Sequence, residues 1–261
     1  MSSTVTASSS AAAASSAAAQ QAVPLTTQQA PAQQAPSIVT EGVTSLAPQT
    51  TLAAAASAAE ATNTSSAGNG VRKASTRVWI VGHSFIHWAA IRALTRVGGQ
   101  NLGFPASKAS IRWLGFKGLC WPQLPNVLTD AHRRWGKPHI ILIHLGGNDM
   151  GAIPSLELTK IIQSDLGWLR AWMPGVIIGW SNVIARRQWR YMGSSGAAYR
   201  VRKKLNRDVG AAVTGNQGFV VRHDAITADK RELYRPDGVH LSDVGLDLFL
   251  GDLSKALAPF L

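Results

Sequence analysis

The sequence predicts a three-layer α/β/α sandwich, in which a five-stranded parallel sheet lies between two layers of helices. From residue 77 onward, short apolar runs alternate with longer stretches whose apolar residues have helical spacing. The run 139–145 (HIILIHL) is nearly continuous in apolar residues, which is typical of a central parallel strand with both faces buried. Because such strands are connected by right-handed crossovers, the alternation leaves few arrangements other than this sandwich.

The first half of the domain supplies three strands and two helices. The first strand ends at Gly82, and apolar residues from Phe85 onward begin the first helix. The second helix follows the turn at Pro122 and carries Pro125 in its first turn, where the missing N–H breaks no helical hydrogen bond. We expect strands at 77–81, 110–114 and 139–145 and helices at 85–96 and 124–135.

The second half supplies two strands and three helices. The long third helix is amphipathic and ends before the Pro-Gly pair at 174–175. The fourth helix carries Val201, Leu205 and Val209 on one face, and Ser242 caps the approach to the last helix. We expect strands at 176–180 and 218–221 and helices at 156–172, 198–213 and 246–257.

The composition changes near residue 70. Residues 1–70 contain no aromatic residue and only two charged ones, Glu41 and Glu60, and consist mostly of Ala, Ser, Thr, Gln and Pro. Such a segment buries too little apolar surface to offset the entropy of ordering, about 1–2 kcal/mol per residue for the backbone. We therefore expect a disordered tail over residues 1–72 and one folded domain over 73–261.

The chain carries a formal net charge of +12, and the part after residue 70 carries +14. This excess is compatible with an anionic partner such as nucleic acid or a membrane surface, but a soluble domain that is simply basic is the preferred interpretation. Two clusters are interpreted either as solvated faces or as contacts to phosphates. They are Arg186, Arg187 and Arg190, and, on the fourth helix, Arg200, Arg202, Lys203, Lys204 and Arg207.

The single cysteine, Cys120, cannot form an intramolecular disulfide, which favours a reducing compartment. The N-terminus lacks the basic region of a signal peptide and the arginines of a mitochondrial transit peptide. No apolar run reaches the about 18 residues that a membrane span needs. We expect an intracellular location, cytoplasmic or nuclear.

Residues suited to nucleophilic catalysis follow four of the five expected strands, at the edge where parallel sheets bind ligands. Ser84 follows the first strand, Gly118 the second and Asn148 the third, while Asp237 and His240 follow the fifth. An aspartate three residues before a histidine can orient the ring, so that its other nitrogen accepts a serine proton. Alone, each feature is also typical of a cap, a turn or a surface loop. Together they predict a nucleophile, a base and donors to an oxyanion.

Several assignments stay open at this level. Gly115 competes with Gly118 as an oxyanion donor, and His223 competes with His240 although it lacks the Asp-x-x-His spacing. Cys120, two residues after Gly118, is interpreted as a buried structural thiol in preference to a residue near the site. The remaining interpretations are His87 and His144 as structural residues and Trp121 or Trp189 as a wall of an acyl pocket.

At these residues the chain resembles the SGNH (GDSL-like) hydrolase family, including platelet-activating-factor acetylhydrolase-like esterases, over about residues 77–258. His83 stands where the family has an aspartate beside the serine, so the local hydrogen bonding must differ. The runs GHSFIHW, IRWLGFKGLCW and DGVHLSDVG are also similar to SGNH domains from fish and amphibian genomes, some encoded by transposable elements. The matched blocks are Gly82-His83-Ser84, Gly118, Gly146-Gly147-Asn148-Asp149 and Asp237-Gly238-Val239-His240.

The resemblance implies a flavodoxin-like fold, Ser84 as nucleophile, and an oxyanion hole built from the Ser84 N–H, the Gly118 N–H and the Asn148 side chain. It implies a serine esterase or acyl-hydrolase that cleaves small-molecule, lipid or sugar esters through an acyl-enzyme. The chain has no clustered metal-ligand spacing and no Walker loop, so we expect no cofactor and no metal. Two alternatives stay open: a basic nucleic-acid-associated module with an accessory or decayed esterase site, and a carbohydrate acetylesterase.

Overall fold

The computed structural model describes residues 74–261, and the tail predicted over residues 1–72 lies outside the described residues. The strands form one parallel sheet in the order β2-β1-β3-β4-β5. They are β1 (Thr76–Gly82), β2 (Ala109–Gly115), β3 (Ile140–His144), β4 (Ile177–Ser181) and β5 (Phe219–Val221). The helices are α1 (Ser84–Leu94), α2 (Leu124–Trp135), α3 (Ser155–Trp172), α4 (Ser195–Thr214) and α5 (Asp243–Leu257).

Each helix and strand expected from the sequence is present, and the predicted fold class is confirmed. Short 3-10 helices add single turns at Gly99–Asn101, Trp121–Gln123, Arg231–Leu233 and Ala258–Phe260. Among residues 74–261, no helix combines the length and the apolar character needed to cross a membrane.

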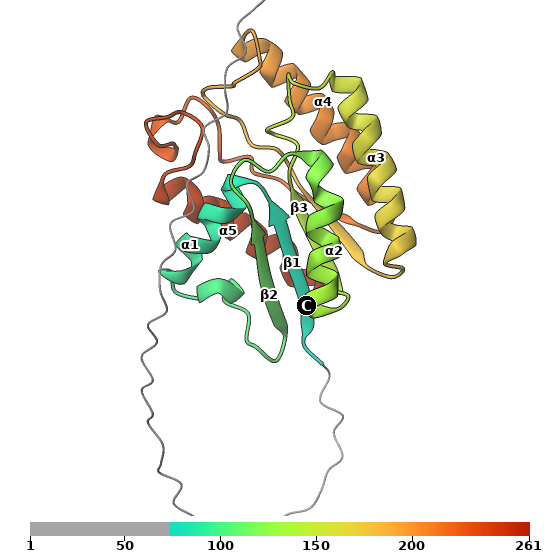
Figure 1. Ribbon diagram of the computed structural model, residues 1–261. Coiled ribbons are helices and arrows are strands. Elements are labelled where there is room, and N and C mark those ends of the chain that lie inside the picture. The colour runs from blue at the N-terminus through green and yellow to red at the C-terminus, as the bar shows by residue number, and fades with distance from the viewer. Residues whose placement is uncertain (1–73) are drawn as a thin grey trace, which may run out of the picture. The chain divides into compact units, whose positions relative to one another are not determined.

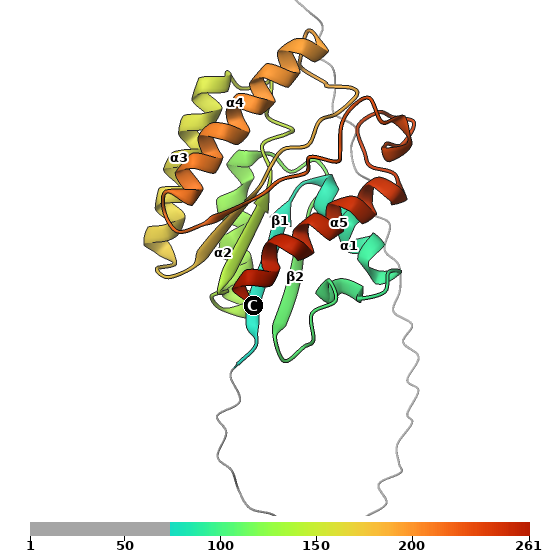
Figure 2. The ribbon, with the colours of Figure 1, turned by 180° about the vertical axis from the view of Figure 1, so that it is seen from behind.

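The helices cover the sheet in two layers. Helices α2, α3 and α4 lie on one face, and α1 and α5 lie on the other (Figures 1 and 2). Along β1, Trp79 and Val81 pack into the first layer, whereas Val78 and Ile80 pack into the second. Because each of these side chains is at most 1% exposed, both faces of the strand are core, and its sequence is a continuous apolar run.

Two glycines at the carboxyl ends of neighbouring strands permit unusually close backbone contacts. A Cβ atom on Gly82 would lie 2.1 Å from the carbonyl oxygen of His144 in β3. One on Gly115 would lie 2.3 Å from the backbone nitrogen of His87 in α1. These contacts hold the start of α1 against the end of β2 and bring β1 close to the end of β3.

The start of α1 differs from the simplest interpretation of the sequence, in which Ser84 caps the helix. The cap is His83, whose Nδ1 accepts a hydrogen bond from the Phe85 N–H at 3.4 Å. Ser84 is the first helical residue, so its hydroxyl is not used as the cap. At the last helix the expected cap is present, because the Ser242 side chain accepts from the Gly245 N–H.

Replacing Gly82 with alanine tests the close approach of β1 to β3. The added methyl group meets the His144 carbonyl, so the strands must separate, and we expect Gly82→Ala to lower the free energy of unfolding by about 3 kcal/mol. Gly167→Ala is the control, because a Cβ atom there meets nothing within 4 Å and lies in the middle of α3. It should stabilise the domain by about 0.5–1 kcal/mol. Urea denaturation measures both changes, and equal effects would contradict the argument.

Candidate active site

Three side chains meet at the carboxyl edge of the sheet. His240 Nε2 lies 2.9 Å from Ser84 Oγ, and His240 Nδ1 lies 2.7 Å from Asp237 Oδ2. Because an ionised aspartate only accepts hydrogen bonds, it places the ring proton on Nδ1 and leaves the lone pair of Nε2 for the serine hydroxyl. A histidine that removes the serine proton as a general base must have this tautomer, with the proton on Nδ1 and the lone pair on Nε2.

The loop that carries the base is held together by Asp237. Its Oδ1 accepts hydrogen bonds from the backbone N–H groups of Val239 and His240 at 2.8 and 2.9 Å, while Oδ2 binds the imidazole. Burial raises the pKa of Asp237, but these hydrogen bonds together outweigh burial and bring the pKa below its ordinary value. The carboxylate is therefore ionised at neutral pH.

The expected oxyanion donors line the same pocket as Ser84 and His240. This pocket has a volume of about 840 Å³ and includes Gly118 and Asn148 in its wall. The N–H groups of Ser84 and Gly118 donate to no other protein atom within residues 74–261, so both can serve a ligand. The rival Gly115 ends β2 against α1 and does not line the pocket.

Arg186 fixes the orientation of Asn148. Arg186 Nη2 donates to Asn148 Oδ1 at 3.1 Å, and Asn148 Nδ2 donates to the Leu119 carbonyl at 3.0 Å. Because a guanidinium only donates, it selects the amide orientation that turns Oδ1 toward it and leaves one Nδ2 hydrogen for the pocket. Arg186 is 9% exposed, and burial lowers its pKa to about 10, so it stays charged at neutral pH.

His83, which replaces the aspartate of the family pattern, contacts the same arginine. The His83 ring has no exposed surface, and its Nε2 lies 3.3 Å from Arg186 Nη2. Burial, and next the positive charge of Arg186, hold the pKa of His83 well below its ordinary value, so the imidazole is neutral. Gly147 makes room for this contact, because a Cβ atom there would lie 2.9 Å from Arg186 Nη2.

Comparison with known proteins gives a fold but no sequence relative. Neither a protein-family model nor a curated protein sequence matches the chain. A GDSL-like lipase from Bacteroides thetaiotaomicron is similar in structure, with 17% identity, coverage of 71% of this chain and 89% of that chain, and a TM-score of 0.53. The chain has the SGNH hydrolase fold. The expectation drawn from the resemblance is therefore confirmed at the level of the fold.

Two further solved structures share the SGNH hydrolase fold. A lipase/acylhydrolase from Enterococcus faecalis has 13% identity, with 70% of this chain and 96% of that chain covered and a TM-score of 0.51. A psychrotrophic esterase from Pseudoalteromonas sp., solved with monoethylphosphonate as inhibitor, has 14% identity, coverage of 71% and 98%, and a TM-score of 0.52. The likeness to domains encoded by transposable elements stays a prediction.

The SGNH hydrolase fold of this chain encloses a second serine–histidine–aspartate arrangement that sequence reasoning missed. Ser181 Oγ lies 2.8 Å from His223 Nε2, and His223 Nδ1 lies 2.9 Å from Asp252 Oδ2. His144 Nδ1 lies 2.9 Å from the same serine oxygen. The rival base His223 is therefore engaged with Ser181, which has no exposed surface.

In this buried network, each side chain donates a hydrogen bond to the next one, from His144 to Asp252. Asp252 accepts, so His223 carries its proton on Nδ1 and accepts the Ser181 hydroxyl proton at Nε2. The serine oxygen then accepts from His144 Nδ1. His144 Nε2 is left with a lone pair that has no hydrogen-bond partner among the described residues. The side chains of this network come from three elements and a loop: β3, β4, α5 and the segment after β5.

The remaining candidates are placed differently from the expectation. Cys120 was interpreted as a buried structural thiol, but it is half-buried and lines the Ser84 pocket. Burial, and next the charge of Asp149, raise its pKa, so the thiol is protonated at neutral pH. Trp121 is fully buried, and its Nε1 donates to Asp165 at 2.7 Å. Of the two tryptophans considered for an acyl pocket, Trp189 alone lines it.

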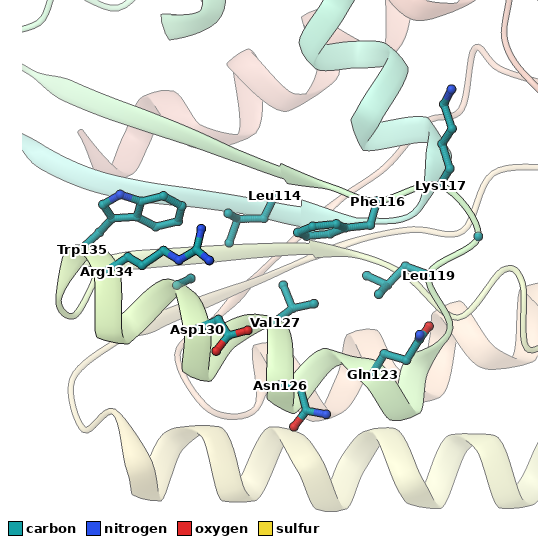
Figure 3. A pocket seen from close by; sticks show the side chains of 12 residues that line it. Leu114, Phe116, Lys117, Leu119, Gln123, Asn126, Val127, Asp130, Arg134 and Trp135 are labelled. Carbon is teal, nitrogen blue, oxygen red and sulfur yellow. The ribbon is translucent and has the colours of Figure 1, made fainter. Parts of the chain in front are cut away.

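A separate cavity of about 450 Å³ lies between the end of β2 and α2 (Figure 3). Phe116, Val127 and Trp135 contribute its apolar wall. Gly118 borders both this cavity and the Ser84 pocket, so the loop 116–119 separates the two. Within residues 74–261, His, Cys, Asp and Glu side chains form no group that could hold a metal ion.

The buried histidines predict a dependence of stability on pH. Burial is the largest cause that lowers the pKa of His83, His144 and His223. In the unfolded chain each binds a proton near pH 6.5, so the unfolded state binds more protons as the pH falls. Stability is complete above about pH 7 and decreases below about pH 6.5, by up to about 1.4 kcal/mol per pH unit for each histidine.

Urea midpoints between pH 5.5 and 7.5 measure this slope. His223→Gln removes one titrating group and should reduce the slope by one proton. A stability that stays level from pH 7.5 to 5.5 would contradict the assignment of neutral, buried rings.

Proposed function

We propose that the chain is a serine esterase or acyl-hydrolase that cleaves carboxylic esters through an acyl-enzyme. The observation that carries the proposal is the 2.9 Å contact between His240 Nε2 and Ser84 Oγ, with Asp237 on the other ring nitrogen. Both residues open into a pocket large enough for a small substrate. The lipase, acylhydrolase and esterase of similar fold support an ester as the substrate.

In the first half-reaction, His240 Nε2 accepts the proton of Ser84 Oγ as the oxygen attacks the ester carbonyl carbon. The carbonyl oxygen becomes an oxyanion, which the Gly118 N–H, the Ser84 N–H and one Asn148 Nδ2 hydrogen stabilise. One such donor typically lowers the barrier by about 3 kcal/mol. Asp237 remains ionised and stabilises the imidazolium that forms.

The intermediate then collapses. His240 gives its proton to the oxygen of the leaving alcohol, the carbon–oxygen bond breaks, and an ester of Ser84 remains. A water molecule, deprotonated by His240, attacks this ester and releases the carboxylic acid. The proton on His240 returns to Ser84 Oγ, which restores the starting state.

Ser84 rather than Ser181 is the proposed nucleophile because of access. Ser84 lines the pocket, whereas Ser181 is completely buried between two imidazoles. The pairing of serine, histidine and aspartate alone does not distinguish the two.

The basic residues do not favour a nucleic-acid module. Arg186, expected in a surface cluster, is buried in the site. On α4, Lys204 and Arg207 form ion pairs with Asp208. Arg202 is partly buried and donates to the Val183 carbonyl. The proposal therefore includes an ester substrate and no nucleic acid.

The nucleophile is tested with a fluorophosphonate probe and a short p-nitrophenyl ester. We expect the probe to label Ser84, and Ser84→Ala to lower kcat/KM by at least about 10⁴-fold, because the attacking oxygen is lost. Ser181→Ala is the matched control; it should still be labelled and should keep turnover. Labelling at another residue, or turnover by Ser84→Ala, would contradict the assignment of Ser84 as the nucleophile. Acetylated sugars and lysophospholipids in the same assay distinguish the substrate classes.

The role of Arg186 is tested with a double-mutant cycle. If Arg186 acts by orienting the Asn148 amide, Arg186→Met should lower kcat by about 10²–10³-fold with little change in KM, the loss that follows removal of an oxyanion donor. Arg186→Lys, which keeps a donor, should recover part of kcat. Asn148→Ala should be no worse when combined with Arg186→Met, because both changes remove the same interaction. Additive losses would mean that Arg186 acts independently of Asn148.

A further inference from the structure

The wall of the Ser84 pocket has more positive than negative charge. Its two acidic side chains are already engaged, because Asp149 accepts the Trp121 N–H and Asp237 binds His240. The basic side chains in the wall are Lys117, Arg186, Arg190 and Arg235. A ligand in this pocket therefore meets more cations than the carboxylates in its wall compensate.

Two of these cations converge on one aromatic ring. Lys117 Nζ lies 4.8 Å and Arg235 Cζ lies 4.1 Å from the centroid of the Trp88 ring. Trp88 is in α1, four residues after Ser84 and thus on the same side of the helix. The three residues come from α1, the loop after β2 and the segment before α5, and all line the Ser84 pocket.

The direction of the Lys117 side chain supports this convergence. Its backbone borders the cavity against α2, but Figure 3 shows the side chain pointing away from α2 and out of that cavity. Neither Lys117 nor Arg235 forms an ion pair within residues 74–261. The Trp88 ring attracts both cations, yet their like charges repel each other, and a bound anion would remove that repulsion.

The loop of the base holds Arg235 in position. The Arg235 N–H donates to the His240 carbonyl at 2.7 Å, and its side-chain Nε donates to the Leu241 carbonyl at 3.1 Å. The Nη groups donate to no atom of residues 74–261 and form a pair of donors, a geometry that suits carboxylate or phosphate oxygens. Lys117 adds a point charge.

We propose that Lys117 and Arg235 form an anion-binding subsite, and that the substrates are esters with a phosphate or carboxylate group near the scissile carbonyl. The substrate part rests on the proposed esterase function, whereas anion binding does not. A pocket of about 840 Å³ has room for both an ester and a charged group.

Anion binding is measured first, without turnover. Calorimetric titration with glycerol 3-phosphate, glycerol and succinate compares phosphate, neutral and carboxylate ligands. We expect the anions to bind and glycerol not to bind, and Lys117→Gln to weaken anion binding by at least about tenfold. Arg112→Gln is the matched control, because its guanidinium lies 4.7 Å from the Trp135 ring and does not line the Ser84 pocket. No binding of either anion, or equal weakening in the control, would overturn the subsite.

Substrate preference is measured with two matched pairs of esters. p-Nitrophenyl hemisuccinate and p-nitrophenyl butyrate share a leaving group and differ by a charge on the acyl side. Acetyl glycerol 3-phosphate and acetyl glycerol differ by a charge on the alcohol side. We expect the charged ester to be favoured in kcat/KM by at least about tenfold in one pair, and Lys117→Gln to reduce that ratio while Arg112→Gln does not.

The ratio cancels any general loss of activity, and the single Lys117 variant leaves the His240 loop unaltered. Lys117→Glu should reverse the preference toward the neutral ester. Preference for the neutral ester in both pairs, or a ratio unchanged in Lys117→Gln, would overturn the substrate class. If no ester is hydrolysed and the fluorophosphonate does not label Ser84, the esterase proposal fails, and the titration alone decides the subsite.

Discussion

The close contact of backbone segments at Gly82 and Gly115 is the constraint on which the candidate site depends. With no side chain at either position, β1 reaches the His144 carbonyl, and α1 begins directly against the end of β2. This fixes where Ser84 leaves the sheet. The base that meets it comes from 156 residues further along the chain, so the 2.9 Å contact requires a rigid sheet beneath both loops.

The domain contains two serine–histidine–aspartate arrangements with the same groups in different surroundings. One lies at the pocket, next to backbone N–H groups that have no partner in the part of the chain that the structure describes. The other lies in the interior, where Ser181 donates to the imidazole of His223 and accepts from that of His144. The interior network of hydrogen bonds links β3, β4 and α5, which gives Ser181 a structural role. The two arrangements differ in their access to a pocket and in the backbone N–H donors beside the serine, whereas their residue types are the same.

The fold could be predicted from apolar patterning, because buried strands leave a continuous run. The strand expected at 139–145 spans Ile140–His144, and the one expected at 77–81 spans Thr76–Gly82. Helix starts were predicted less well. The fourth and fifth helices begin three residues before the expected positions, at Ser195 and Asp243. Each starts with two exposed residues after a serine cap, so the apolar period of the buried face begins only later.

The site was predictable only where residues form a local motif. Asp237 and His240 are three residues apart, and Ser84 and Asn148 each follow a clear strand, so the sequence indicates them. Arg186 has no such signal. In the sequence it belongs to a basic run that is typical of a solvated surface, and its burial arises from packing against the loops that carry His83 and Gly147. Asp252 also lacks a local motif in the sequence, since its partner His223 lies 29 residues away in another segment.

The shared guanidinium of Arg186 has a consequence for the residue at position 83. Because His83 Nδ1 accepts from the Phe85 N–H, the neutral ring carries its proton on Nε2 and does not accept from Nη2, so the arginine can hold the amide oxygen of Asn148. A carboxylate at the same position would be a full counter-ion at close range in a nonpolar interior, and it would draw the cation to itself. The two positions therefore behave as one electrostatic unit, in which the absence of an anion keeps the amide aligned.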